Sequence, residues 1–320
     1  MSGAVRTVLG DVPADRLGIT YLHEHLILDS PLVHDRFPHI WLPSVEDATV
    51  EVGACATAGV GAMLDAMPCA SGRDVGKLAA VSRATGVHLI AATGLHTAKY
   101  YDGRGWTQEE DVDVLADLFT ADVVEGIDRY DYAGPVVRRT PHPAGVVKVA
   151  TAGEVPSPAE RRAFGAAAET ARRTGVPLLT HCEDGRGAPA QLELLRELGV
   201  PLERVVLSHT DKVRDPGYHR ELLQSGVNLE YDQALRQDPD EPRGTAWLIA
   251  AMVADGHAGH LLLGTDGARR SLWRSLGGSP GLAWLAAGFP AVLERHGVDA
   301  DVLRQLLVDN PARVLALAAS

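Results

Sequence analysis

Residues 19–25, with the sequence ITYLHEH, decide the fold class that we expect for this chain. The apolar and β-branched start predicts a β-strand, which we expect to cover residues 19–28. Side chains at positions i and i+2 of a strand point to the same face. His23 and His25 therefore project together as a chelating pair, whereas Glu24 points to the opposite face, toward helices that cover the sheet.

Seven more short apolar runs follow, each bounded by turn residues and separated from the next by a helix-length segment. These expected strands cover residues 60–67, 87–93, 145–150, 176–181, 204–209, 226–231 and 260–264. Two of the intervening helices are expected over residues 158–174 and 189–199. Eight alternations of strand and helix are typical of an α/β fold of the (β/α)8 type, a TIM barrel.

The ends of the chain fit a single barrel domain over residues 1–320. Residues 5–11 (VRTVLGD) predict a short N-terminal β-hairpin, and residues 301–318 predict a C-terminal helix, with Pro311 near a helix start. A rival fold, the open doubly wound sheet, needs a glycine-rich phosphate loop after its first strand. Residues 29–31 (DSP) stand there instead.

Composition excludes several classes of protein. The 320 residues are 46% apolar and 22% charged, which fits a globular enzyme with a large core. The net charge of −12 argues against a nucleic-acid partner. No apolar run approaches membrane-spanning length, and no signal core opens the chain. Cys55, Cys69 and Cys182 lie far apart, which disfavours a disulfide framework and predicts a reducing, cytoplasmic location.

The strand ends carry the candidate chemistry, because barrel enzymes place catalytic groups at the C-terminal ends of their strands. Following the expected strands to their ends adds Lys148, His181, His209 and Asp266 to the histidine pair. These positions are far apart in the sequence but meet at one mouth when a barrel closes. Imidazole and carboxylate are good ligands for zinc, manganese, iron or cobalt. The pattern therefore predicts a metal centre.

Lys148 is unusual because it stands in the apolar run VVKVA at residues 146–150. A buried ammonium group is unfavourable, and more so beside metal cations. Three outcomes avoid the difficulty. The side chain points to solvent, it is a neutral amine that forms a Schiff base, or it reacts with carbon dioxide to give a carbamate that can bridge two metal ions. The nearby histidines favour the carbamate.

A set of short motifs, in this order, resembles the phosphotriesterase family of the amidohydrolase superfamily over nearly the whole chain. They are VRTVLG at residues 5–10, LGIT with HEH at 17–25, Lys148, TH at 180–181, LSHTD at 207–211 and GTD at 264–266. The resemblance implies a hydrolase with two divalent metal ions. Zinc is the first expectation, and manganese, cobalt and iron are alternatives, because the same ligands suit each of them.

The resemblance also implies a role for each motif residue. The buried ion would be held by His23, His25 and Asp266, and the more exposed ion by His181 and His209. Lys148, carboxylated at N6, would bridge the ions together with a hydroxide. Two cations lower the pKa of a bridging water, so that hydroxide exists near neutral pH. Asp266 is placed to accept the proton of that hydroxide when it attacks.

Loops after the strands set substrate specificity in a barrel. The loop at residues 94–101 offers His96, Tyr100 and Tyr101 to a substrate, and the resemblance to lactonases makes Tyr100 a candidate catalytic residue. Arg269 and Arg270 follow the eighth strand and are candidates for binding a carboxylate or phosphate. Further charged and polar groups in neighbouring loops favour an anionic or sugar-like substrate over a neutral organophosphate: Lys212, Arg214, Asp232, Gln233 and Arg236.

The function that we expect is hydrolysis of a carboxylic ester in a small molecule, foremost a lactone, with slow promiscuous phosphotriester hydrolysis. One alternative is amide hydrolysis of an N-acyl compound by the same centre. Another is a metal-free aldolase that forms a Schiff base at Lys148, and a third is a non-catalytic binding protein. A homodimer is compatible with the resemblance, although no interface stripe in the sequence demands one.

Overall fold

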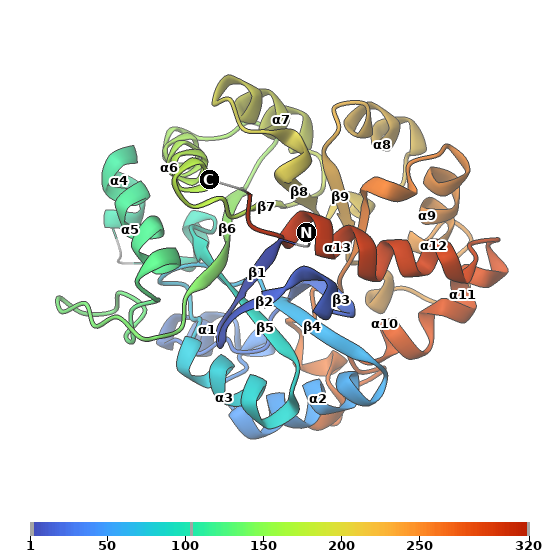
Figure 1. Cartoon of the computed structure of the whole chain (residues 1–320), viewed down its shortest axis with the longest axis horizontal. Coiled ribbons are helices and arrows are strands. Elements are labelled where there is room, and N and C mark those ends of the chain that lie inside the picture. Colours follow the sequence, from blue (N-terminus) through green and yellow to red (C-terminus); the bar gives the residue numbers. More distant parts are fainter. Residues whose placement is uncertain (1–2, 103–104, 319–320) are drawn as a thin grey trace.

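The computed structural model describes residues 3–102 and 105–318, and eight parallel strands form its centre (Figure 1). The strands are β3 (Ile19–Glu24), β4 (Val60–Asp65), β5 (His88–Gly94), β6 (Ala144–Thr151), β7 (Leu178–Cys182), β8 (Val205–Ser208), β9 (Asn228–Tyr231) and β10 (Leu261–Leu263). Each pairs with its neighbour in sequence order. The backbone N–H groups after β10, at Thr265 and Asp266, donate to the carbonyl of His23 at 3.2 and 2.9 Å and close the circle. The predicted TIM barrel is confirmed, and the open doubly wound sheet is excluded.

The barrel interior is packed with apolar side chains below the C-terminal strand ends. This interior cluster takes from the barrel strands Leu22, Ala62, Leu64, Ile90, Ala92, Val146, Leu179, Val206 and Leu262. On β6, Val147 and Val149 belong instead to the outer cluster between strands and helices. Because strand side chains alternate, Lys148 points into the barrel, one layer above Val146. This alternation excludes the solvent-facing lysine that the sequence left open.

Helices surround the sheet and bury its outer face (Figure 1). The longer ones are α2 (Val45–Thr57), α3 (Val75–Thr85), α5 (Val112–Val124), α6 (Pro158–Thr174), α7 (Ala188–Glu197), α8 (Pro216–Leu223), α9 (Thr245–Ala254) and α11 (Phe289–Arg295). Short α-helices are α1 (Pro31–Arg36), α4 (Trp106–Glu109) and α10 (Trp284–Ala287). None of the helices that the structure describes is long and apolar enough to cross a bilayer.

Single helical turns occupy many connections. They are η1 (Ala14–Arg16), η2 (Pro38–Ile40), η3 (Ala98–Tyr100), η4 (Leu202–Arg204), η5 (Thr210–Lys212), η6 (Ala234–Arg236), η7 (Ala258–His260), η8 (Arg270–Leu272) and η9 (Arg274–Leu276). Three of these, η3, η5 and η6, follow the C-terminal ends of β5, β8 and β9 and therefore lie at the mouth of the barrel.

Helix α6 has the bounds that the sequence predicts, because both of its ends carry strong signals. Ser157 and Glu160 form a capping box at its start, and Gly175 takes a left-handed conformation (φ 74°) at its end. Helix α7 starts one residue earlier and ends two residues earlier than the range predicted from the sequence, residues 189–199.

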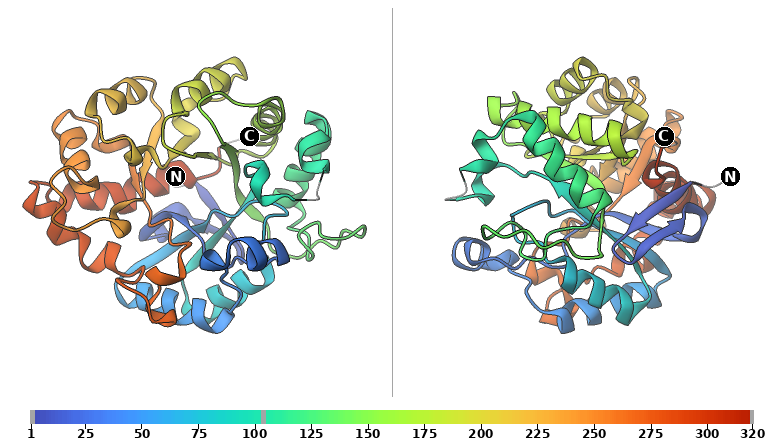
Figure 2. Two further views of the ribbon diagram at one scale, coloured as in Figure 1. Left: turned by 180° about the vertical axis from the view of Figure 1, so that it is seen from behind. Right: turned by 60° about the vertical axis from the view of Figure 1, so that its left-hand side comes forward.

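The N-terminal hairpin and the C-terminal segment close the opposite end of the barrel. Strands β1 (Ala4–Thr7) and β2 (Gly10–Pro13) are antiparallel, which confirms the predicted hairpin. The N–H of Leu317 donates to the carbonyl of Ala4, and Val314 and Leu315 join the interior cluster. Figure 2 shows the N-terminal hairpin beside the C-terminal helices. The predicted C-terminal helix is present but not uniform: α12 (Ala300–Arg304) and α13 (Asn310–Leu315) flank a π-helical turn, η10 (Gln305–Asp309).

The first barrel strand ends earlier than predicted, at Glu24 instead of residue 28. The carboxylate of Asp65 accepts the N–H groups of Leu26 and Ile27 at 2.7 and 3.3 Å. These donors therefore leave the sheet ladder, and only Leu28 pairs again, in an isolated bridge with Leu42. The side chain of Asp65, from the neighbouring strand β4, thus ends β3 at Glu24, between the two histidines of the motif.

Gly94 at the end of β5 allows β5 and β6 to approach closely beside Lys148. Its φ is +98°, and a Cβ atom there would overlap the carbonyl oxygen of Lys148. We expect Gly94→Ala to lower the free energy of unfolding by about 2 kcal/mol or more, through backbone strain and overlap together. Gly86→Ala is the matched control, because Gly86 has φ +75° in open space; strain alone should cost about 1 kcal/mol. Denaturant unfolding of both variants checks this, and equal losses would contradict the overlap.

Candidate active site

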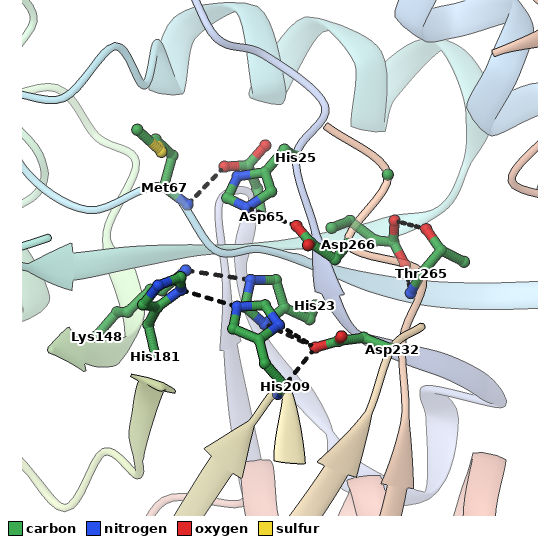
Figure 3. A network of polar contacts seen from close by, with 12 residues as sticks. His23, His25, Asp65, Met67, Lys148, His181, His209, Asp232, Thr265 and Asp266 are labelled. Atoms are coloured by element: carbon green, nitrogen blue, oxygen red, sulfur yellow. Dashed lines mark hydrogen bonds and ion pairs between the residues drawn. The ribbon is translucent and has the colours of Figure 1, made fainter. Parts of the chain in front are cut away.

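The six side chains predicted for the metal centre gather at one place, above the interior cluster (Figure 3). They come from the ends of β3, β6, β7, β8 and β10 and are His23, His25, Lys148, His181, His209 and Asp266. Their nitrogen and oxygen atoms face one another in pairs. Lys148 Nζ lies 3.1 Å from His23 Nε2, His181 Nδ1 lies 2.8 Å from His209 Nε2, and His25 Nε2 lies 3.4 Å from Asp266 Oδ1.

The donor set fits divalent metal ions. His23, His25 and Asp266 each offer one ligand atom, and these atoms lie within 4.8 Å of one another. A second such group joins His23 and His209 to Asp232. Imidazole nitrogens and carboxylate oxygens at this spacing are typical ligands of zinc and related transition metals. The site can thus hold cations without any rearrangement of the strands.

Two of the site residues have left-handed backbone conformations. The φ angle is 62° at His209 and 42° at Asp266, values that residues other than glycine seldom adopt. Each residue directly follows or lies close to the end of its strand, so the sharp turn aims its side chain back across the mouth. Strain of this kind is often found at functional sites, where the surrounding structure holds it in place.

Carboxylates hold three of the imidazole rings from behind. His209 Nδ1 lies 2.6 Å from Asp232, His23 Nδ1 donates to Glu230 at 3.3 Å, and His181 Nε2 donates to Glu183 at 2.9 Å. Such contacts leave the other ring nitrogen free to bind a metal and fix the direction of the ring. From the sequence, Asp232 is expected only as a polar loop group, and Glu230 and Glu183 are not predicted. The i, i+2 spacing of Glu230 and Asp232, the same as in the histidine pair, was the available signal.

Burial dominates the electrostatics of the centre. It lowers the pKa of Lys148 to about 8, although nearby carboxylates such as Asp266 oppose the shift. Burial, and then the neighbouring His209, lowers the pKa of His181 to about 3. Burial alone would raise the pKa of Asp266, but the Arg236 guanidinium and the hydrogen bond from His25 hold it well below its usual range. Neutral imidazoles and an ionised Asp266 are the forms that bind cations.

Glu24 lies on the face opposite the histidine pair, as the strand alternation predicts, but it is fully buried. Its carboxylate accepts the backbone N–H of Thr265 at 2.9 Å and also contacts the Thr265 hydroxyl. Burial raises the pKa of Glu24 to about 8. This contact ties β3 to the segment that carries Asp266 and so helps to place that residue.

The loop after β5 brings His96 and Tyr100 to the centre but turns Tyr101 away. The His96 ring lies 4.6 Å from that of His181 and 4.4 Å from that of Tyr100, centroid to centroid. His96 Nδ1 accepts the N–H of Thr97 at 2.7 Å, so its proton is on Nε2. Tyr101 is 3% exposed, and its hydroxyl accepts the N–H of His96 at 2.6 Å. Its predicted contact with substrate is not supported, because the hydroxyl stabilises the loop instead.

The predicted anion-binding arginines have different placements. Arg269 is exposed, whereas Arg270 donates to the carbonyl of Trp41 at 2.7 Å and is thereby directed to the backbone. Lys212 likewise donates to the carbonyl of Glu183 at 2.7 Å. Arg236, on η6, enters the centre and lies 2.7 Å from Asp266 Oδ2. The sequence offered no sign of this contact, because it depends on the path of the loop after β9.

Comparison with known proteins places the chain in a family. The family model for the phosphotriesterase family matches residues 3–315. The chain belongs to the phosphotriesterase family. This family is one of metal-dependent hydrolases, so the predicted family and the predicted enzyme class are both confirmed.

Relatives within the phosphotriesterase family match over nearly their full length. A phospho-furanose lactonase from Mycoplasmopsis synoviae is 32% identical over 97% of this chain and 91% of its own. The crystal structure of an amidohydrolase from Mycoplasma synoviae superposes with a TM-score of 0.91 at 31% identity, covering 100% of this chain and 93% of that one. The structure of a lactonase from Listeria monocytogenes gives 0.90 at 25% identity, over 99% and 100%.

In this member of the phosphotriesterase family, Asp65 holds the backbone on which the histidine pair stands. Besides the N–H groups of Leu26 and Ile27, its carboxylate accepts that of Met67 at 3.2 Å (Figure 3). The side chain is fully buried, so no solvent can replace it.

We expect Asp65→Asn to lower the free energy of unfolding by about 2 kcal/mol or more, because the amide cannot accept all three buried donors. Asp35→Asn, at a 72% exposed carboxylate, is the control for the same chemical change and should have little effect. Thermal and denaturant unfolding of the metal-free proteins measure both. Equal stability of the two variants would contradict the role of Asp65.

Proposed function

We propose that the chain is a binuclear metal hydrolase of carboxylic esters, with an anionic sugar lactone as its substrate. The observation that carries the proposal is the convergence of imidazole and carboxylate groups from the ends of four strands, β3, β7, β8 and β10, on one fully buried lysine on β6. A metal-free aldolase has no use for that many imidazoles, and a binding protein has no need for a buried amine. The whole barrel is proposed to act as one hydrolase domain.

The residues proposed to hold the ions divide into two groups around Lys148. His23, His25 and Asp266 would bind the buried ion, and His181 and His209 the exposed one. Zinc is proposed first, with manganese, cobalt or iron as alternatives. Such ions, when bound, would supply Lewis-acid polarisation of the scissile bond and a hydroxide nucleophile near neutral pH.

Lys148 is proposed to be carboxylated at N6. Because burial lowers its pKa to about 8, a substantial fraction of the amine is neutral near that pH and can react as a nucleophile. The nitrogen lone pair attacks the carbon of carbon dioxide, so that an N–C bond forms while one C–O π bond breaks and leaves its electron pair on oxygen. One N–H proton is released to the solvent. The resulting carbamate is an anion, and it offers two oxygens between the two groups of ligands.

Asp266 and Tyr100 are proposed to act on the substrate. Asp266 accepts the proton released during attack, and Arg236 at 2.7 Å keeps its carboxylate in place and ionised beforehand. Tyr100 contacts His96 at the mouth, and burial raises its pKa to about 12, so its hydroxyl stays protonated as a hydrogen-bond donor. It is proposed to donate to the carbonyl oxygen of the substrate.

The substrate class is inferred from relatives and from charge. The phospho-furanose lactonase and lactonase relatives support a lactone, and the former supports a phosphate group on it. Exposed Arg269, in the loop after β10, offers a cation at the mouth for such an anion. A neutral aryl phosphotriester would lack this attraction and is proposed only as a slow, promiscuous substrate.

Metal removal tests the centre directly. Chelation is expected to abolish hydrolysis, and zinc, manganese or cobalt should restore it, with about two ions bound per chain. The metal content, by elemental analysis, and the hydrolytic activity are both measured before and after chelation. Full activity in verified metal-free protein would rule out the proposal, and borohydride trapping of a carbonyl compound on Lys148 would indicate an aldolase instead.

A substrate screen with metal-loaded protein tests the reaction. Phosphorylated sugar lactones should show the highest kcat/KM, ahead of neutral lactones, aryl esters, N-acyl amino acids and paraoxon-like triesters. Asp266→Asn should fold and bind substrate but lose about 10³-fold in kcat, because it removes the proton acceptor. Near-normal turnover by this variant would remove Asp266 from the mechanism, and a clear preference for N-acyl compounds would identify an amidase.

A further inference from the structure

Glu183 lies where three loops of the barrel mouth meet. It follows β7 by one residue, and its carboxylate has two different partners. Oε1 accepts from Lys99 Nζ, on η3 after β5, at 2.7 Å. Oε2 accepts from His181 Nε2 at 2.9 Å. Its backbone carbonyl accepts from Lys212 Nζ, on η5 after β8, at 2.7 Å.

The contact with Glu183 determines which nitrogen of His181 faces the centre. Since Nε2 donates its proton to the carboxylate, Nδ1 carries the lone pair, and this atom lies 2.8 Å from His209 Nε2. The pair of nitrogens that would bind the exposed ion is thus aligned from behind. A second carboxylate, that of Asp232, lies 2.6 Å from Nδ1 of His209, the nitrogen that does not face His181.

Lys99 adds a link to the loop that faces the substrate. It stands beside Tyr100 on η3, and its ammonium lies 5.4 Å from the centre of that ring. Tyr100 contacts His96, and His96 contacts His181 through ring centroids 4.4 and 4.6 Å apart. The loop after β5 therefore reaches His181 by two routes, one through edge-to-face and tilted ring contacts and one through the ion pair of Lys99 with Glu183.

The ion pair between Lys99 and Glu183 contributes too little to the free energy of unfolding for stability to be its main role. The side chains of Lys99 and Glu183 are 43% and 35% exposed. Pairs this exposed contribute at most about 1 kcal/mol to folding. A carboxylate behind a metal-binding imidazole, in contrast, commonly changes metal affinity about 10- to 100-fold. The larger effect of Glu183 is expected on the exposed metal site.

We infer that Glu183 and Lys99 are positioning residues, which hold His181 for the exposed metal ion and couple that ion to the substrate loop after β5. Glu183 acts by fixing the imidazole. Lys99 acts one step further away, by fixing the carboxylate of Glu183 and the turn that carries Tyr100. This inference rests on the proposed function, because it assumes that His181 binds a metal ion.

Zinc binding by the full-length metal-free protein tests the inference, with a chromophoric chelator as competitor. Glu183→Gln should lower the affinity of the protein for one of the two zinc ions by about 10- to 100-fold, and its affinity for the other ion should stay at the wild-type value. Lys99→Met should lower the affinity for the same ion by a smaller factor. It should also raise KM by a larger factor than it lowers kcat. Asp184→Asn, an exposed carboxylate in the same loop, is the matched control and should behave as wild type.

Melting of the metal-free proteins separates positioning from folding. The four proteins should melt at the same temperature, because the exposed pair contributes little to stability. Wild-type zinc affinity in Glu183→Gln, or equal weakening of both ions, would overturn the inference. If Glu183→Gln folds poorly, the Lys99→Met variant tests the inference. Wild-type zinc affinity together with wild-type KM in that variant would overturn the inference. Failure of the wild-type protein to bind two ions would instead refute the proposed function.

Discussion

The burial of Lys148 at the mouth of the barrel is the constraint on which the site depends. A fully buried amine cannot remain an isolated ammonium group without a large free-energy penalty. Its immediate partner is an imidazole nitrogen of His23, which offers no negative charge. The side chains around Lys148 are instead a ring of imidazole and carboxylate groups that are able to bind cations. The proposed carbamate would turn the unfavourable cation into an anion that belongs in such a ring.

A layer of carboxylates, buried except for Glu183, surrounds this centre and contacts its imidazole rings. One imidazole ring is contacted by each of three carboxylates, those of Asp232, Glu230 and Glu183. The carboxylate of Asp65 holds the backbone that follows the pair of His23 and His25. Although burial opposes the shift at Asp232, the pKa values of Asp232 and Glu183 lie below the usual range, because the histidines that they contact favour their ionised forms. These two carboxylates are therefore negative where bound ions would be positive. The barrel supplies the strand ends, and the loops that carry Glu183, Arg236 and Tyr100 lie around them at the mouth.

Much of the fold could be predicted because short apolar runs and helical spacing are local properties. All eight strands lie where the apolar runs predict them, and α6 has the predicted bounds. The misplaced end of β3 has a non-local cause, since the carboxylate that withdraws Leu26 and Ile27 from the ladder comes from β4. The π-helical turn in the C-terminal helix was not predicted, and we have no local sequence signal for it.

The sequence by itself determined the residues that end the strands, and therefore the chemistry that a closed barrel collects. His23, His25, Lys148, His181, His209 and Asp266 could be named from strand alternation, strand order and family resemblance, because a parallel barrel places all C-terminal strand ends at one mouth. Only the tertiary structure decided which loop side chains join them. Tyr101 turns away from the centre and Arg270 donates to a backbone carbonyl, whereas Arg236 and Glu183 contact the site residues. Loop paths depend on contacts between distant segments, which leave no periodic pattern in the sequence.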